Sequence, residues 1–414
     1  MMSTLLISET FPPKTGGSGR WFWEIYRRQP IDQYIIAAGL DPHQQAFDLT
    51  QELRVTRMPL GFSDLGMFSL RGWKGYWAAL RGLLQLVREH NVDQVHAGRC
   101  LPEGWLAWLL KQRHGTPYIC YVHGEEVKLP GSGESHGVMS SRQLRWITRN
   151  VMNEAAFLIA NSHNTERILL DEWDIPPERI RLLYPGADCN RFKPAPRDLA
   201  VRNALGWGER PVVLTVGRLQ KRKGHDRMIA ALLQILQRVP DVLYAIVGAG
   251  AEQPALEKMT ADLQLGDSVL FHGEIDDEAM LSCYQQCDLF VLPNRQIGSD
   301  IEGFGMVLVE AQACGKSVIA GASGGTAETM QIPATGRVVP CEEPGPLAEL
   351  VTSWLLDAPL RERMGLAARN WAATHFDWTA LSQQAAALFA SASRRAVKAA
   401  PAALRAKVGD LPIP

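Results

Sequence analysis

The sequence lacks several features that would assign it to a common class of protein. Its seven cysteines are scattered among 414 residues, and none forms a C-x-x-C pair. This spacing argues against a disulfide framework and a zinc site, and it fits a reducing compartment such as the cytoplasm. No apolar run reaches the ~18 residues expected of a membrane-spanning helix. Residues 1–8 lack the basic start and cleavage site of a signal peptide, and they read better as a first strand.

The chain also lacks a charge of one sign. Its formal net charge is −1, with 46% hydrophobic and 21% charged residues. This is the composition of a globular protein, and it gives no electrostatic reason to expect a nucleic-acid partner. Any basic surface must therefore be local. Without a membrane span or a signal peptide, the protein is expected to be cytoplasmic, or at most peripheral on the inner face of a membrane.

Two segments are candidates for such a local surface. The tail at 392–414 is basic, which is typical either of a mobile tail or of a contact with an anionic membrane surface. Residues 72–90 combine basic residues with Trp73 and Trp77 at helical spacing, which is typical either of a membrane-facing helix or of a core helix packed on a sheet. The core helix is the favoured interpretation of 72–90.

The length exceeds what one hydrophobic core usually serves, so two domains are expected. Short buried strands alternate with helices in each half of the chain, and a polar linker rich in Pro and Gly separates the halves at 191–210. This alternation predicts two parallel α/β sheets. The expected domains are 1–192 and 205–374, with a helix at 376–391 that follows them.

A glycine-rich stretch, Ser299 to Glu328, is the strongest candidate for a ligand site. Gly303 and Gly305 let the backbone approach a ligand, and an amphipathic helix is expected at 306–313. The free N–H groups at the start of that helix favour an anion. Glu302 and Glu310 lie eight positions apart, so both carboxylates can face the same end of the site if Glu310 is on the exposed side of the helix.

Two further loops follow predicted strands. The loop at 217–224 places four cations after the strand at 212–216, where a diphosphate would bind in a parallel sheet. The loop at 11–19 follows the first strand and is rich in Pro and Gly, as in a phosphate cradle. Gly248-Ala249-Gly250 suggests a dinucleotide site only weakly, because Gln253 replaces the third small residue of G-x-G-x-x-G.

These motifs together resemble the retaining nucleotide-sugar glycosyltransferases called family 4. E-G-F-G followed by a second Glu resembles the E-x7-E signature, and G-R-L-x-x-x-K-G resembles the phosphate-binding loop. Pro-Pro-x-x-Gly-Gly and His123-Gly124-Glu125 resemble two further motifs of that family. His96 matches a related His-x-His strand end only in part, because Gly98 replaces the second His.

The resemblance implies two Rossmann-like domains facing each other across a cleft, the GT-B arrangement, with the helix at 376–391 crossing back onto the first domain. It also implies a site. Its catalytic residues are Arg218, Lys223, His123 and Glu302, and its donor-binding residues are Gly16, Gly17, Gly273, Gly303, Phe304, Gly305, Met306, Val307 and Glu310. The amide of Gly17 would face the donor phosphate, His123 the transferred sugar, and Gly273 the nucleotide base.

The implied reaction is retaining transfer of a hexose from a nucleotide diphosphate sugar to a lipid or glycan acceptor. Similarity to phosphatidylinositol mannosyltransferase-type enzymes favours GDP-mannose over a UDP-sugar. No cofactor or metal is expected, because Arg218, Lys223 and a helix N-terminus already face the phosphates and the sequence has no D-x-D motif. A sugar-nucleotide 2-epimerase of the same fold and a non-catalytic nucleotide-sugar-binding protein remain open as alternatives.

Overall fold

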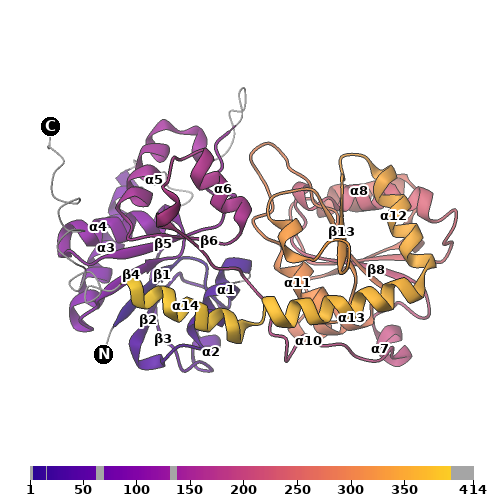
Figure 1. The fold of residues 1–414 in the computed structure, drawn as a ribbon, viewed down its shortest axis with the longest axis horizontal. Coiled ribbons are helices and arrows are strands. Elements are labelled where there is room, and N and C mark those ends of the chain that lie inside the picture. The colour runs from indigo at the N-terminus through magenta and orange to yellow at the C-terminus, as the bar shows by residue number, and fades with distance from the viewer. Residues whose placement is uncertain (1–2, 15, 62–69, 131–137, 393–414) are drawn as a thin grey trace.

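The computed structural model describes residues 3–14, 16–61, 70–130 and 138–392; within these ranges the side chains of 70, 71, 73 and 138 are not described. Except for residue 392, the predicted basic tail at 392–414 lies outside the described part of the chain, as does the side chain of Trp73. Figure 1 shows two lobes side by side, each built on a parallel sheet flanked by helices. The predicted fold class is confirmed.

The first lobe is organised around a seven-stranded parallel sheet of order β3-β2-β1-β4-β5-β6-β7. The strands are β1 (Thr4–Ser8), β2 (Tyr34–Ala38), β3 (Arg54–Arg57), β4 (Gln94–Ala97), β5 (Tyr118–Val122), β6 (Leu158–Ala160) and β7 (Ile180–Leu182). The strand order reverses at β1, which pairs with both β2 and β4. In such doubly wound sheets ligands bind beyond the carboxyl ends of the strands, at this reversal.

Helices cover both faces of this sheet. On one face, α3 (Leu70–Glu89), α4 (Trp105–His114) and α5 (Arg142–Glu154) share a single hydrophobic cluster with the strands. Tyr76, Leu80, Leu83 and Val87 of α3 are buried in it, so the core-helix interpretation of 72–90 is correct for that side of the helix. The other face carries α1 (Gly17–Tyr26) and α14 (Trp378–Ala392). The smaller helices α2 (Gln44–Asp48) and α6 (His163–Asp171) complete the lobe.

The second lobe holds a six-stranded parallel sheet of order β10-β9-β8-β11-β12-β13. Its strands are β8 (Val212–Val216), β9 (Leu243–Val247), β10 (Val269–Gly273), β11 (Leu289–Leu292), β12 (Val318–Gly321) and β13 (Gly336–Val339). Its helices are α7 (Leu199–Ala204), α8 (His225–Ile235), α9 (Gln253–Asp262), α10 (Asp277–Gln286), α11 (Met306–Ala313), α12 (Pro344–Leu356) and α13 (Ala358–His375).

The chain passes between the lobes in two segments that touch each other. Ala187 forms a parallel bridge with Asp377, with the Ala187 N–H donating to the Phe376 carbonyl at 2.9 Å. Beyond this crossing, α14 returns to the first lobe, where Trp378, Leu381 and Phe389 are buried beside α1. The last helix that the structure describes is therefore part of the first lobe's core, although it follows the second lobe in sequence (Figure 1).

Two expectations from the composition, the missing disulfide framework and the missing membrane-spanning helix, can be compared with the structure. All seven cysteines are buried free thiols. In the described part of the chain, no helix is long and apolar enough to cross a bilayer.

Candidate active site

A cavity of about 360 Å³ lies between the two lobes and receives polar side chains from both. The first lobe lines it from the loop after β5 and the second from the loops after β8 and β11. The lining residues are Glu125, Glu126, Lys128 and Met139, and Arg218, Gln220, Arg222, Ser299 and Asp300. The carboxyl ends of parallel strands from both sheets thus meet at this cavity, as expected for doubly wound sheets.

Beside this cavity, Glu302 is held by two cations. The Lys223 ammonium and the Arg222 guanidinium each donate to Oε2 of Glu302 at 2.5 Å, and all three side chains are buried. Burial alone would raise the pKa of Glu302, but the two cations lower it to about 2. Burial also lowers the pKa of Lys223, an effect that Glu302 opposes. Glu302 and Lys223, two of the predicted catalytic residues, are therefore in direct contact.

Arg218 takes a different position from Lys223, although both belong to the loop after β8. Its side chain is exposed and lines the cavity, whereas Lys223 is buried against Glu302. The intervening Leu219 is fully buried. An exposed guanidinium at the mouth of a cavity is placed to bind an anion in two-pronged fashion.

The start of α11 lies against the glycine loop of the first lobe. A Cβ added to Gly17 would come within 3.5 Å of Met306 Sδ, so the two predicted phosphate-binding segments are brought together. Met306 and Val307, in the first turn of α11, are partly exposed, and the first N–H groups of a helix lack intrahelical partners. The arrangement suits an anion held between the two lobes.

The prediction that α11 is amphipathic was wrong. Six of its eight residues are buried, because the helix lies between the second sheet and α13. Glu310 is consequently not on an exposed stripe: it is 7% exposed and accepts a hydrogen bond from the Tyr284 hydroxyl of α10 at 2.7 Å. Burial raises the pKa of Glu310, and the nearby Arg20 of α1 opposes that rise. Glu302 and Glu310 thus have separate sets of partners.

His123 is buried at the end of β5, and burial favours its neutral form. Burial, and to a smaller extent Arg99, lowers its pKa to about 3. Its Nε2 lies 2.8 Å from the Gly98 carbonyl, which can only accept, so Nε2 carries the proton and Nδ1 is left as an acceptor. The rings of Trp21 and Phe22 pack edge-on against it. A neutral, fixed imidazole here is suited to hydrogen bonding with a substrate hydroxyl.

The structure also shows what surrounds Phe304, Gly273 and His96. The ring of Phe304 is buried against Tyr184 and Phe376, so only its backbone is left for a ligand. Gly273 ends β10, and a Cβ added there would meet no atom within 4 Å. His96 is fully buried, bonded to the Tyr26 hydroxyl at 2.6 Å and packed on Phe389 of α14, so its surroundings are those of a core residue.

The two lobes touch closely around this site. A Cβ on Gly303 would lie 2.5 Å from the His123 carbonyl, and one on Gly325 would lie 2.9 Å from Ser162 Cβ, so glycine is required at both points. Beside them, Glu328 accepts hydrogen bonds from the first two N–H groups of α6, those of His163 and Asn164, at 2.7 and 2.8 Å. A second-lobe carboxylate thereby caps a first-lobe helix.

Sequence reasoning assigned no role to Arg222, Tyr284 or Glu328. Arg222 belongs to a motif that was recognised, but only the flanking Arg218 and Lys223 matched the family pattern. The partners of Tyr284 and Glu328 lie 26 and more than 140 residues away, respectively. No local signal in the sequence marks such contacts.

The fold and the site define a glycosyltransferase of the GT-B class. Residues 20–186 match the family described as glycosyl transferase 4-like domain, and residues 200–371 match glycosyl transferases group 1. The chain therefore belongs to glycosyltransferase family 4, as the motifs indicated, and it is a hexosyltransferase.

Two of the curated relatives match along nearly their whole length. The chain is 31% identical over 392 residues to the GDP-mannose-dependent monoacylated alpha-(1-6)-phosphatidylinositol monomannoside mannosyltransferase of Corynebacterium glutamicum, covering 92% of this chain and 96% of that protein. It is 29% identical over 395 residues to the GDP-mannose-dependent alpha-(1-6)-phosphatidylinositol monomannoside mannosyltransferase of Mycobacterium tuberculosis, covering 93% and 97%.

Solved structures establish the same fold. Anabaena HepE in complex with UDP superposes with a TM-score of 0.78 at 22% identity, over 94% of this chain and 100% of that one. Sucrose-phosphate synthase from Thermosynechococcus elongatus gives 0.78 at 23% identity, over 94% and 99%.

Proposed function

We propose that this enzyme transfers mannose from GDP-mannose to a phosphoinositol-mannoside glycolipid or a related lipid-linked glycan, with retention of configuration. The observation that carries this proposal is the similarity to the mannosyltransferases of Corynebacterium and Mycobacterium, which spans more than nine-tenths of each chain. A UDP-sugar donor is the principal alternative, since the structurally similar HepE was solved with UDP.

In the proposed reaction the bond between the sugar's anomeric carbon and the donor phosphate breaks, and the acceptor hydroxyl attacks from the same face. The acceptor proton passes to the leaving phosphate oxygen, so no side-chain nucleophile is needed. Negative charge gathers on the diphosphate, where Arg218, Lys223 and the N–H groups at the start of α11 would stabilise it. Glu302 would accept from a sugar hydroxyl, and Glu310 from the ribose.

A lipid acceptor fits the surface formed by the outer sides of α3, α4 and α5, which we call the basic helical layer. The helix α4 packs against both neighbours, and the Arg113 guanidinium lies 5.0 Å over the Trp77 ring. Its described basic residues are Lys74, Arg81, Arg88, Lys111, Arg113, Arg142, Arg145 and Arg149, and its exposed or partly exposed tryptophans are Trp77, Trp105, Trp108 and Trp146.

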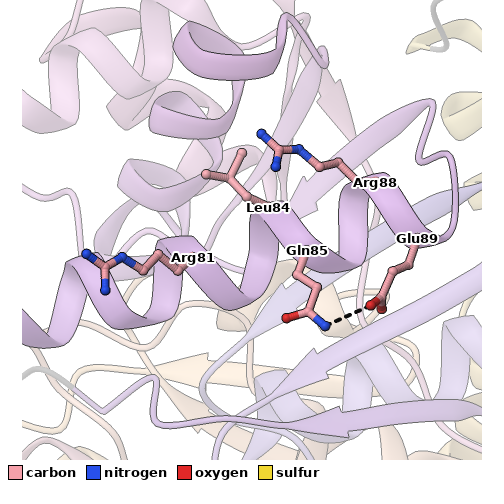
Figure 2. A pocket seen from close by; sticks show the side chains of 5 residues that line it. All are labelled: Arg81, Leu84, Gln85, Arg88 and Glu89. Carbon is pink, nitrogen blue, oxygen red and sulfur yellow. Dashed lines mark hydrogen bonds between the residues drawn. The ribbon is translucent and has the colours of Figure 1, made fainter.

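Acids are scarce on the basic helical layer. The three helices contain only two, Glu89 and Glu154, and Glu154 is paired with Lys111 at 2.7 Å. Figure 2 shows Arg81 and Arg88 projecting from α3, with Gln85 bonded to Glu89. These side chains line a surface hollow of about 470 Å³. On α5, Trp146 is 62% exposed next to Arg142 and Arg145. Tryptophan beside cations is the composition that favours an anionic bilayer surface.

We therefore expect the protein to co-sediment with vesicles containing anionic phospholipid at low salt, and less so at high salt. A cation near such a surface contributes about 1 kcal/mol, so Arg142→Glu should weaken binding by roughly tenfold or more, and Trp146→Ser should weaken it further. Matched controls lie on the second lobe, where Arg337 is exposed and Leu366 is 71% exposed. Equal losses with Arg337→Glu and Leu366→Ser would contradict the assignment.

The donor is tested first by thermal shift with GDP, UDP and ADP. A ligand at a hundred times its dissociation constant adds about 2.7 kcal/mol to stability, and GDP is expected to give the largest shift.

Transfer of radiolabelled mannose from GDP-mannose to a phosphatidylinositol mannoside is then measured, with and without EDTA. We expect product in both, because fixed cations already face the phosphates. Activity lost in EDTA and restored by Mn²⁺ would overturn metal independence, and conversion of the sugar nucleotide without transfer would indicate an epimerase.

A further inference from the structure

Arg222 lies in the loop after β8, between exposed Lys221 and buried Lys223, and is itself 4% exposed. Its guanidinium contacts three carboxylates. Nη1 lies 2.5 Å from Glu302, Nε lies 3.0 Å from Asp300, and Nη2 lies 3.5 Å from Glu125. The first two acids belong to the second lobe and the third belongs to the first lobe.

Within the described part of the chain, both side-chain contacts of Glu302 are made by one of its two carboxylate oxygens. Both Arg222 and Lys223 donate to Oε2, and the Glu302 backbone N–H is bonded to Ser323 Oγ at 3.3 Å. With Oε2 anchored from two directions, the plane of the carboxylate is fixed, and Oε1 is the oxygen left to accept from a substrate hydroxyl. A single ammonium would not fix that plane, because it is a point charge on a flexible stem.

We propose that Arg222 is a positioning residue for the transfer reaction: it sets the orientation of Glu302 and, through Glu125, ties that orientation to the His123-Gly124-Glu125 loop of the first lobe. The proposal rests on the nucleotide-sugar transfer proposed above. Both arginines line the cavity, but Arg218 is exposed, whereas Arg222 is buried against three carboxylates, and the proposal gives the two residues distinct roles.

The physical argument is one of geometry in a buried site. A displacement of about 1 Å in a group that orients a substrate can cost on the order of 100-fold in rate. Glu302 is 8% exposed, so its charge depends on the two cations, and its pKa of about 2 reflects both of them. Without Arg222 the carboxylate keeps one partner, and its free oxygen is no longer directed.

The first test compares Arg222→Gln and Arg222→Lys with wild type. Because Arg222 acts on Glu302, we expect kcat to fall by roughly 10- to 100-fold in Arg222→Gln, with donor KM and the calorimetric Kd for GDP within about threefold. Arg222→Lys should recover part of the rate, since it restores a cation but not the planar fork. Lys221→Gln is the matched control, with the same loss of charge at the exposed neighbour and no expected change.

A double-mutant cycle then asks whether Arg222 acts through Glu302. If it does, Arg222→Gln should lower kcat much less in a Glu302→Gln background than in wild type. Additive losses would overturn the proposal, as would a rise in donor or acceptor KM at unchanged kcat, which would make Arg222 a substrate ligand. The same cycle with Glu125→Gln tests the link to the first lobe.

Thermal unfolding of each variant separates loss of function from loss of fold. A folded Arg222→Gln protein with wild-type kcat would also end the proposal. If wild-type enzyme fails with GDP-mannose but transfers from another nucleotide sugar, the donor proposed above is wrong, and the Arg222 variants are assayed with the sugar that is used.

Discussion

Replacing Lys223 by alanine is expected to lower kcat by about 100-fold or more while donor KM moves less. As the bond to the leaving phosphate breaks, charge gathers on that phosphate, so a fixed cation gains interaction energy in the transition state. Lys223 is buried and held by Glu302, so it is pre-organised and only weakly screened by water. In the proposed reaction, ground-state binding of the donor would be shared with the start of α11 and with Arg218, so a smaller change in KM is expected.

The same substitution has a structural cost that must be separated from the kinetic one. Removing one member of a buried ion pair typically destabilises a protein by about 3 to 5 kcal/mol. Here Arg222 still neutralises Glu302, which limits that cost. Lys223→Met keeps the packing of the side-chain stem and serves as a second variant. Steady-state kinetics on proteins shown to be folded decide the matter: a raised donor KM at unchanged kcat would mean that the ammonium only holds substrate.

Arg218 offers a related comparison. Its exposed guanidinium can grip a phosphate through two N–H groups, whereas an ammonium cannot. The kcat of Arg218→Lys, measured by steady-state kinetics, should therefore remain below that of the wild-type enzyme, even though the charge is kept.

Glu310→Ala is expected to weaken nucleotide binding by about 1.5 to 3 kcal/mol, the typical value of a hydrogen bond to a charged group. The reason is that the buried carboxylate would accept from the ribose hydroxyls, with its orientation fixed by the Tyr284 hydroxyl. Titration calorimetry with GDP measures the effect directly.

Two variants sharpen this experiment. Glu310→Gln keeps the size of the side chain and an acceptor for Tyr284 but loses the charge, so it should retain the fold and still bind GDP more weakly. Tyr284→Phe removes only the orienting hydroxyl, and a smaller loss is expected. If Glu310→Ala binds GDP as wild type does, the carboxylate is a structural partner of α10 and nothing more.

What the sequence predicts well in this protein is set by local patterns. The helix at 306–313 and the strand at 212–216 were placed at the residues where the structure has α11 and β8. A continuous apolar run predicts each element, and a glycine or a polar turn marks its end. By contrast, β3 (Arg54–Arg57) was missed, because this edge strand is partly exposed and carries two arginines.

The contacts that define the site were beyond local patterns. Glu302 meets Lys223 across 79 residues of sequence, and Glu328 meets His163 across 165. The buried carboxylate of Glu310 meets Tyr284 of α10, a contact between elements that hydrophobic spacing within α11 could not reveal. Local patterns therefore nominated candidate site residues, whereas their pairing required the packed structure.

The return of α14 to the first lobe has a consequence for how the chain is made. Domains usually fold as units while the ribosome is still extending the chain, the N-terminal one first. Here the core around α1 includes Trp378, Leu381 and Phe389, which are synthesised after every strand of the second sheet. The second lobe can thus complete its core during translation, while the lobe that is made first must wait for residues made almost two hundred positions later.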